Sequence, residues 1–295
     1  MSTVYFLVQQ MMFFSIPLLV VALGGMFSER SGVVNIALEG IMIMGAFSSI
    51  LFINLMQEGG INLPPQLLLV LAILIAAAVG VVVSLLHAYA AINMKADQVI
   101  SGTAINMFAP AFAIFVARMI RTVQQIPFTN TFRLEKVPVL GDIPVLGPLL
   151  FQNAYITTYL GFAILAVAAI VLYKTKFGLR LSACGALAGI GGLVFVIPTS
   201  TQFNATVSGY GFLALAVLIF GQWKPARILF AAFFFGLMMT IASVYSGIPL
   251  LNGLGIPSDI YKMVPYAATL VVLAFTSKNS QSPRASGVPY DKGSR

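Results

Sequence analysis

The sequence predicts an all-α, polytopic integral membrane bundle of about nine spans, with eight to ten compatible with the pattern. The first observation is composition: 59% of the 295 residues are hydrophobic, 8% are charged, and the mean hydropathy is +0.98. The second is that several apolar windows exceed the roughly 20 residues needed to cross the hydrocarbon core. Together these features exclude a water-soluble domain of this length.

The apolar windows define the elements. The first stretch has no basic n-region and no small-residue cleavage site, so we expect a retained helix and not a secretion signal. A ninth apolar segment, 260–276, must also cross or re-enter. The Pro- and Gly-rich segment 118–153 predicts a short amphipathic helix plus turns. The eight clearer spans are expected at 5–27, 31–56, 64–92, 98–117, 154–173, 181–198, 204–222 and 228–246.

Charge sets the orientation of these spans. The positive-inside rule is satisfied when the N-terminus is outside, because eleven of the sixteen Lys and Arg residues then lie in cytoplasmic connections and the tail. The basic residues are scattered in short connections and form no stripe, so the net charge of +8 predicts topology and no nucleic-acid partner. We expect a transmembrane domain at 1–276 in contact with lipid, and a flexible cytoplasmic tail at 277–295.

Chemistry carried by metals, cofactors or bound ATP is not expected. A single cysteine, Cys184, excludes an intrachain disulfide, and a single histidine, His87, makes a transition-metal site improbable. No G-x-x-x-x-G-K-[ST] phosphate loop occurs anywhere in the sequence. The sequence therefore predicts no cofactor, no metal and no enzymatic activity in this chain.

Polar residues inside the expected spans are the functional candidates. If a helix begins near Ser31, Glu39 lies about 12 Å into the bilayer, close to the midplane, where a carboxylate must be solvated, paired or protonated. Asn35, Asn106 and Asn204 are amides within or at the edge of spans. Each of these four residues is expected either to hydrogen-bond across helices or to contact a polar solute, and the residues alone leave both open.

Other positions are expected to be structural. His87 is interpreted as a satisfied interior or interfacial imidazole, and Trp223 as an interface anchor. The glycines of GALAGIGG predict close helix packing through small residues. Ser208–Gly211 opens one span and Ser246–Pro249 closes the next, which indicates either broken helices at a binding site or simple turns at span ends.

Five segments resemble one family. SERSGVVNIALEGIMIMGAF (28–47) is similar to the second span of permease subunits of bacterial ABC importers for nucleosides and simple sugars. The other four resemble the nucleoside branch in particular. They are ISGTAINMFAP (100–110), GALAGIGGLVFVIPTSTQFN (185–204), GYGFLALAVLIFGQWKP (209–225) and the tail GVPYDKGSR.

The resemblance implies a chain in the bacterial inner membrane that forms the translocation path for nucleosides. It implies three partners: a second homologous permease, a cytoplasmic ATPase subunit and an extracytoplasmic solute-binding protein. On this basis the solute path is expected at Asn35, Glu39, Asn106 and Asn204, with Tyr210 and Phe212 as possible stacking faces.

The chain departs from the family at one place. In the family, the equivalent of KFGLRLSACG is followed by roughly two dozen cytoplasmic residues that include the coupling helix for the ATPase. Here Cys184-Gly185 continues directly into the next span, so we expect impaired coupling. Two alternatives stay open: a proton-coupled secondary transporter that titrates Glu39 or His87, and an assembly partner of another permease.

Overall fold

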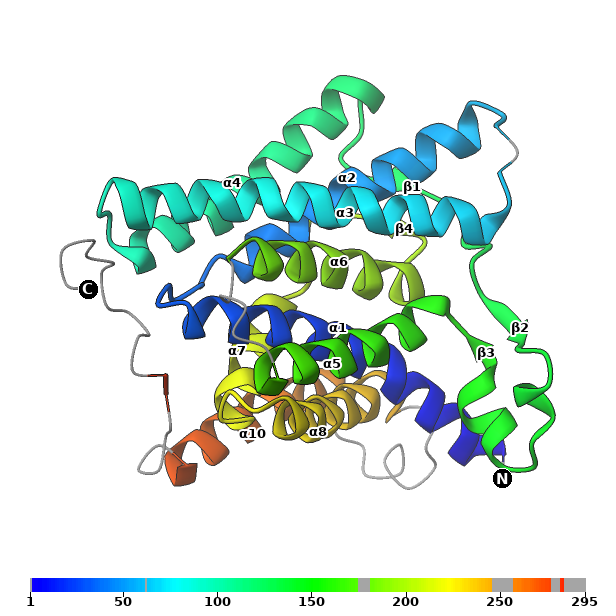
Figure 1. Cartoon of the computed structure of the whole chain (residues 1–295). Helices are drawn as coiled ribbons and strands as arrows, with labels where there is room; N and C mark the ends of the chain where they lie inside the picture. The colour runs from blue at the N-terminus through cyan, green and yellow to red at the C-terminus, as the bar shows by residue number, and fades with distance from the viewer. Residues whose placement is uncertain (1, 62, 175–180, 246–256, 277–281, 284–295) are drawn as a thin grey trace.

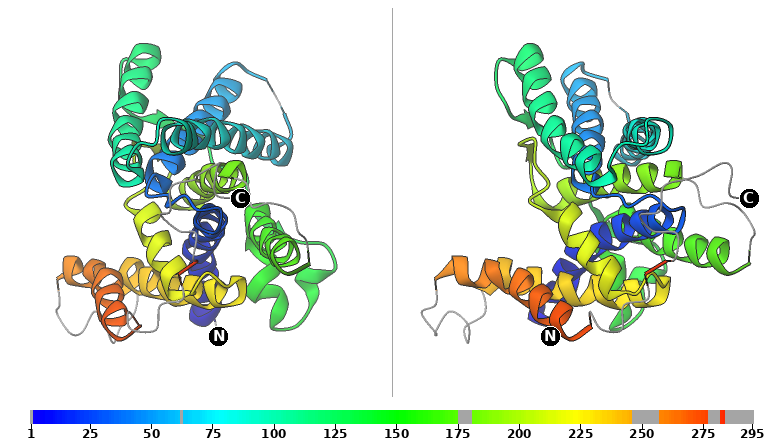
Figure 2. Two further views of the ribbon diagram at one scale, coloured as in Figure 1. Left: turned by 60° about the vertical axis from the view of Figure 1, so that its left-hand side comes forward. Right: turned by 90° about the vertical axis from the view of Figure 1, so that its left-hand side faces the viewer.

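The computed structural model describes residues 2–61, 63–174, 181–245, 257–276 and 282–283. It is a bundle of helices with a few two- and three-residue strands at one end (Figure 1). Successive helices from α1 to α6 run in alternating directions (Figure 1), and two further views show the same bundle from other sides (Figure 2). The membrane-bundle prediction is confirmed.

Seven helices in the described part of the chain are long and apolar enough to cross a membrane. They match the expected spans within a few residues at most ends, apart from the start of the second span. Their bounds are α1 Ser2–Arg30, α2 Leu38–Glu58, α3 Pro65–Ala88 with a π-helical extension at Tyr89–Asn93, α4 Gln98–Arg121, α5 Ile156–Lys174, α6 Leu181–Thr199 and α8 Pro225–Val244.

Local signals explain several of these boundaries. α3 and α8 each begin with proline, which has the helical φ and lacks an N–H that would be unpaired there. α4 begins after Asp97, whose carboxylate accepts from the backbone N–H groups of Val99 and Ile100. α4 ends where Thr122 takes a left-handed conformation.

Two elements differ from the expectation. The segment 204–222 contains only an eleven-residue helix, α7 Tyr210–Phe220, which is about 16 Å long and thus covers about half of a bilayer core of ~30 Å. The second span starts at Leu38 instead of near Ser31, because residues 31–37 are not helical. The estimate of Glu39's depth that assumed a helix from Ser31 is therefore wrong. The ninth segment is present as α10 Ser258–Thr276.

The core is built by α1, α2 and α6, which are buried along most of their length, together with one face of α3, while α4 and α5 are largely exposed. Glycines allow the close approach of these helices. A Cβ on Gly189 would lie 2.2 Å from the carbonyl oxygen of Ala76 in α3, and one on Gly192 would lie 2.0 Å from that of Met42 in α2. The predicted small-residue packing is confirmed.

The expected amphipathic helix in 118–153 is not what the structure contains. That region holds β1 Ile126–Pro127, β2 Leu134–Lys136, a 3-10 turn at Leu140–Asp142, a π-helical turn at Gly147–Phe151 and the start of β3 Gln152–Ala154. The prediction of a helix was wrong because β2 pairs with β3, and β1 pairs with β4 Gln202–Phe203, both antiparallel. These pairings satisfy backbone groups that a helix would have satisfied internally.

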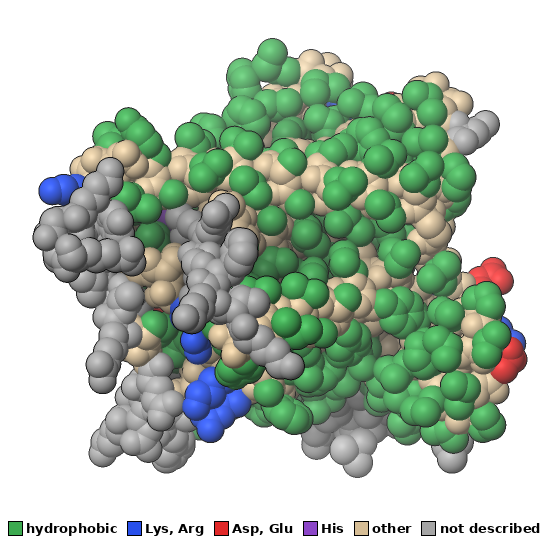
Figure 3. Space-filling model, in the orientation of Figure 1, with side chains coloured by type: hydrophobic (Ala, Val, Ile, Leu, Met, Phe, Trp, Pro, Cys, Tyr) green, Lys and Arg blue, Asp and Glu red, His purple; other side chains and the backbone are tan. Residues whose placement is uncertain are grey.

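The surface agrees with a membrane setting. The face in Figure 3 is mostly hydrophobic, and the charged side chains visible on it gather at the two ends of the bundle. Lys and Arg dominate at the left-hand end of this view, and the most prominent acidic side chains lie at the right-hand end. This is the distribution that the positive-inside rule predicts for an external N-terminus. The expected tail, 277–295, lies almost entirely outside the described residues.

Candidate solute path

The start of α7 is held by the carboxylate of Glu39. Oε1 accepts from the backbone N–H of Gly209 at 2.9 Å, and Oε2 accepts from that of Gly211 at 2.6 Å. These N–H groups belong to the first turn of a helix, where no intrahelical acceptor exists, so a carboxylate there satisfies them and complements the helix dipole. Glu39 is 7% exposed. It is therefore paired within the protein.

Glycine is required on both sides of Tyr210 for this contact. Gly209 has φ +79°, a left-handed conformation that favours glycine. A Cβ on Gly211 would lie 2.4 Å from the backbone nitrogen of Glu39. The GYG sequence therefore lets the start of α7 approach the start of α2. The sequence of Ser208–Gly211 indicates either part of a broken helix or a turn at the end of a span, and the structure contains a half-length helix there. Ser246–Pro249 lies outside the described residues.

Two amides hold the non-helical entry to α2. Asn106 on α4 accepts from the backbone N–H of Gly40 at 2.7 Å and donates to the carbonyl of Ile36 at 2.8 Å. Asn35 is fully buried; its Oδ1 accepts from the N–H of Ala37, and its Nδ2 lies 3.0 Å from Cys184 Sγ. These side chains replace the backbone partners that residues 31–37 would have in a helix.

His87 contributes to the same entry segment. It is fully buried, with Nδ1 2.9 Å from Ser101 Oγ and Nε2 3.3 Å from the carbonyl oxygen of Val34. Both ring nitrogens therefore have protein partners, and the prediction of a satisfied interior imidazole is confirmed. In the described residues, no group of three His, Cys, Asp or Glu side chains is arranged to hold a metal ion.

Trp223 is not the interface anchor that its sequence position suggested. It is 4% exposed, and its indole Nε1 donates to Glu29 Oε2 at 2.8 Å. Arg30 Nη2 donates to the carbonyl of Trp223 at 2.7 Å. The expectation was wrong because Glu29, at the end of α1, gives the indole a buried hydrogen-bond acceptor. The sequence around Trp223 and Lys224 carries no sign of this distant contact. The contact ties the end of α1 to the connection between α7 and α8.

A polar cavity of about 510 Å³ lies between α1, α6, α7, α8 and the segment 200–208. Gln10 near the start of α1, Thr199 at the end of α6 and Ser243 near the end of α8 place it toward the external end of the bundle. The full lining in the described residues is Gln10, Phe14, Phe195, Val196, Pro198, Thr199, Ser200, Gln202, Phe203, Asn204, Thr206, Ser208, Tyr210, Met239 and Ser243.

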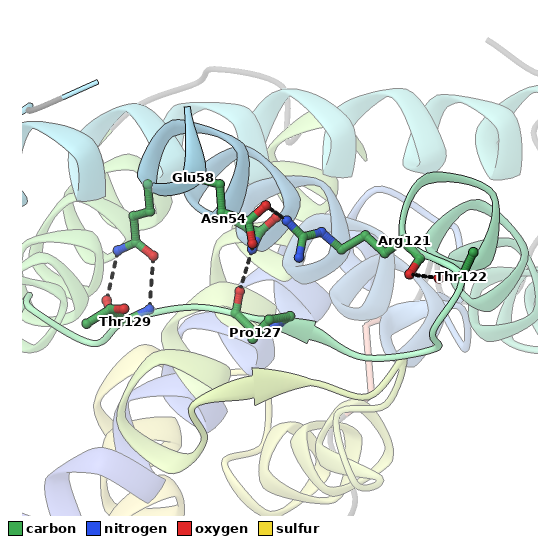
Figure 4. A network of polar contacts seen from close by, with 7 residues as sticks. Asn54, Glu58, Arg121, Thr122, Pro127 and Thr129 are labelled. Carbon is green, nitrogen blue, oxygen red and sulfur yellow. Dashed lines mark hydrogen bonds and ion pairs between the residues drawn. The ribbon is translucent and has the colours of Figure 1, made fainter. Parts of the chain in front are cut away.

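One wall of this cavity is braced from α2 and α4. Arg121 at the end of α4 pairs with Glu58 at the end of α2, and Asn54 donates to the carbonyl of Pro127 at 2.8 Å (Figure 4). Gln57 exchanges two hydrogen bonds of 2.9 Å with the backbone of Thr129. These contacts fix β1, which pairs with β4 and so positions Gln202 and Phe203 in the cavity wall.

The structure separates the six residues expected in the path. Asn204, which is exposed, and Tyr210, whose side chain is buried, line the polar cavity, and the ring of Tyr210 lies 4.1 Å from that of Phe195. Phe212 is half-exposed and lines a smaller apolar cavity of about 260 Å³ with Tyr266. Asn35, Glu39 and Asn106 bond within the protein, as described above.

Sequence reasoning missed most of the cavity. Gln10, Ser200, Thr206 and Ser243 come from three different parts of the chain, which only the fold brings together. One signal was available: the pair Gln9-Gln10 interrupts an otherwise apolar first span. Gln9 donates to the carbonyls of Pro148 and Gln152, whereas Gln10 lines the cavity.

The comparisons with known proteins decide the family. Residues 7–186 match the model of the branched-chain amino acid transport system permease component. The chain belongs to this permease family. It is 40% identical to the guanosine ABC transporter permease protein NupQ of Bacillus subtilis, over 96% of this chain and 95% of that protein. It is 36% identical to the nucleoside ABC transporter permease protein NupC of Lactococcus lactis, over 99% and 98%.

The permease is 27% identical to a putative glucose ABC transporter permease protein, TsgC13, of Haloferax volcanii, over 90% of each chain. No solved structure matches it. Family membership and the apolar helices together indicate a multi-pass plasma-membrane protein, and they favour an ABC permease over the proton-coupled alternative.

Proposed function

We propose that this permease carries nucleosides through the membrane as a subunit of an ATP-driven importer. The observation that carries the proposal is the identity of 40% and 36% to guanosine and nucleoside permeases, over at least 95% of each chain. The glucose permease of similar length is 27% identical. The cargo is thus inferred from the more similar relatives and not from the name of the family model.

The half-length helix α7 supports a transport role. Transporters bind cargo where discontinuous helices begin inside the membrane. α7 begins at Tyr210 beside the start of α2, and the polar cavity adjoins it. We propose Asn204 and Tyr210 as contacts along the path, with Asn35, Glu39 and Asn106 as positioning residues that hold the starts of α2 and α7. A stacking role for Phe212 stays a prediction.

The energy source must be a separate subunit, because the sequence has no phosphate loop. The proposed assembly has a second homologous permease, a cytoplasmic ATPase and an extracytoplasmic binding protein. A second relative from Lactococcus lactis, the nucleoside permease protein NupB, is 24% identical to this chain. That organism therefore has two nucleoside permease proteins that are each similar to this chain, which fits a pair of homologous permeases.

The coupling loop is the point at which this chain differs. The alignment with NupQ spans 311 positions, and 96% of this chain is about 283 residues, so about 28 positions face a gap in this chain. The alignment with NupC gives about 26 in the same way. The family match ends at residue 186. These observations support a missing segment near Cys184, and we infer weak coupling to ATP hydrolysis.

The test is uptake of tritiated guanosine by cells that express the chain with its partner permease, ATPase and binding protein. The chain as it stands is compared with a version that carries a relative's loop after Cys184, at matched expression. We expect the restored version to import guanosine several-fold faster. Equal uptake by both versions would overturn the inference about the loop. Absence of guanosine uptake by both would overturn the nucleoside function.

A further inference from the structure

The polar cavity has the chemistry of a site for a neutral solute. Its described lining contains side-chain hydroxyl and amide groups, and none of these residues is charged. Among the described residues, the amides of Gln10 and Asn204 have no hydrogen-bond partner, so their donors and acceptors are available to a ligand. Such sites combine a few polar groups with apolar walls, and 510 Å³ is within the usual range of ligand pockets.

Tyr210 adds a buried polar group. Its side chain is 1% exposed, it belongs to the cavity lining, and its hydroxyl has no hydrogen-bond partner within the described part of the protein. A buried hydroxyl without a partner is destabilising. A polar ligand in the cavity that brought an acceptor within reach of this group would supply the missing bond.

Glu39 occupies the place where an anionic ligand would bind. The start of a helix attracts anions through its free N–H groups and its dipole. At the start of α7, however, the N–H groups of Gly209 and Gly211 already donate to the Glu39 carboxylate. The anion-binding position at the start of α7, next to Tyr210, is therefore already occupied by a side chain of the protein. A phosphate or the carboxylate of an amino acid would find no free N–H groups at this helix start.

Aromatic side chains provide the apolar wall. Phe14, Phe195 and Phe203 line the cavity, and the Phe195 ring is tilted by 36° against that of Tyr210. Aromatic faces of this kind pack against a planar base, and the amides and hydroxyls match the edges of a base and the hydroxyls of a sugar. A neutral nucleoside combines all of these features, whereas a nucleotide or a zwitterionic amino acid does not.

We infer that the cavity between α1, α6, α8 and the start of α7 is a binding site for an uncharged nucleoside, recognised by Gln10, Asn204 and Tyr210, with the anion-binding start of α7 already occupied by Glu39. The inference rests on the proposed function and assigns its cargo to one place. Because the cavity lies toward the external end of the bundle, it is the first site in the membrane that a nucleoside delivered from outside would meet.

Thiol labelling tests the site without depending on ATP coupling. The only native cysteine, Cys184, is fully buried, so a cysteine introduced at an exposed position is the reactive one. Ser243→Cys places a thiol of similar size in the cavity wall, and Gln125→Cys places one at an exposed position outside it. Membranes with the complete transporter are treated with a water-soluble methanethiosulfonate, with and without guanosine.

We expect guanosine to slow the labelling of Ser243→Cys at least threefold and to leave Gln125→Cys unchanged. Guanosine monophosphate and leucine should protect neither position. Adding Asn204→Ala or Tyr210→Phe should raise the guanosine concentration needed for protection by roughly threefold to tenfold, the effect of losing one hydrogen bond between neutral groups. Tyr173→Phe, on the exposed face of α5, should not change it.

Different failures are distinguishable. If the loop-restored chain imports guanosine but guanosine does not protect Ser243→Cys, the binding site lies elsewhere and the inference is overturned. Equal protection by guanosine monophosphate or leucine would overturn the selectivity for uncharged solutes. Failure of the loop-restored chain to import guanosine would instead overturn the proposed function on which the inference rests.

Discussion

Replacing Glu39 by glutamine should destabilise the bundle measurably. The carboxylate accepts from two backbone N–H groups, at 2.9 and 2.6 Å, in a site that is 7% exposed. Glutamine keeps one acceptor oxygen but turns an NH₂ group toward the other N–H. Since a hydrogen bond to a charged group contributes about 1.5–3 kcal/mol, we expect that loss in the free energy of unfolding. Glu39→Ala loses both bonds, about 3–6 kcal/mol.

The assay measures the melting midpoint of the detergent-solubilised protein. The fraction of protein that stays monodisperse is determined after heating to a series of temperatures. At roughly 2–4 °C per kcal/mol, Glu39→Gln should lower the midpoint by roughly 3–12 °C. Glu58→Gln is the matched control on the same helix: the Glu58 side chain is 54% exposed, and an exposed ion pair contributes about 0–1 kcal/mol. If the two glutamine variants melt at the same temperature, the carboxylate of Glu39 does not hold the start of α7.

Three further substitutions test the packing around the path. Asn106→Ala removes both bonds to the start of α2 and should cost about 1–3 kcal/mol in the same melting assay; an unchanged midpoint would contradict that role. Gly189→Ala places a Cβ 2.2 Å from a carbonyl oxygen of α3, so the yield of folded protein should fall several-fold, whereas Ala104→Val on the exposed face of α4 should express normally. Trp223→Phe removes the donor to Glu29 and should cost about 1.5–3 kcal/mol; a melting midpoint equal to that of the natural chain would show that the bond is unimportant.

The helical spans could be predicted because a long apolar segment has few alternatives in a bilayer. Every backbone group must be paired internally where water is absent, so such windows form helices. The segment predicted at 98–117 is α4 Gln98–Arg121, and that predicted at 228–246 is α8 Pro225–Val244. The glycines of α6 were correctly assigned to packing, because small residues in a span are typical of helix contacts.

The interruptions of the helices could not be predicted, because tertiary contacts decide them. Residues 31–37 are as apolar as a helix requires, but Asn106, which is distant in sequence, supplies the partners that let them stay non-helical. α7 is short because Glu39 caps its start within the bundle. The cavity likewise combines residues of α1, α6 and α8. No local pattern carries these long-range pairings.

The proposed role of this chain is to carry nucleosides for an ATP-driven importer. The most direct measurement is accumulation of tritiated guanosine in proteoliposomes that contain the loop-restored chain, its partner permease and the ATPase, with the binding protein outside. We expect accumulation that requires ATP at the ATPase, persists with a protonophore and is not inhibited by excess leucine. The proposed role would be contradicted if a protonophore abolished guanosine accumulation while ATP was intact. It would also be contradicted if excess leucine abolished that accumulation.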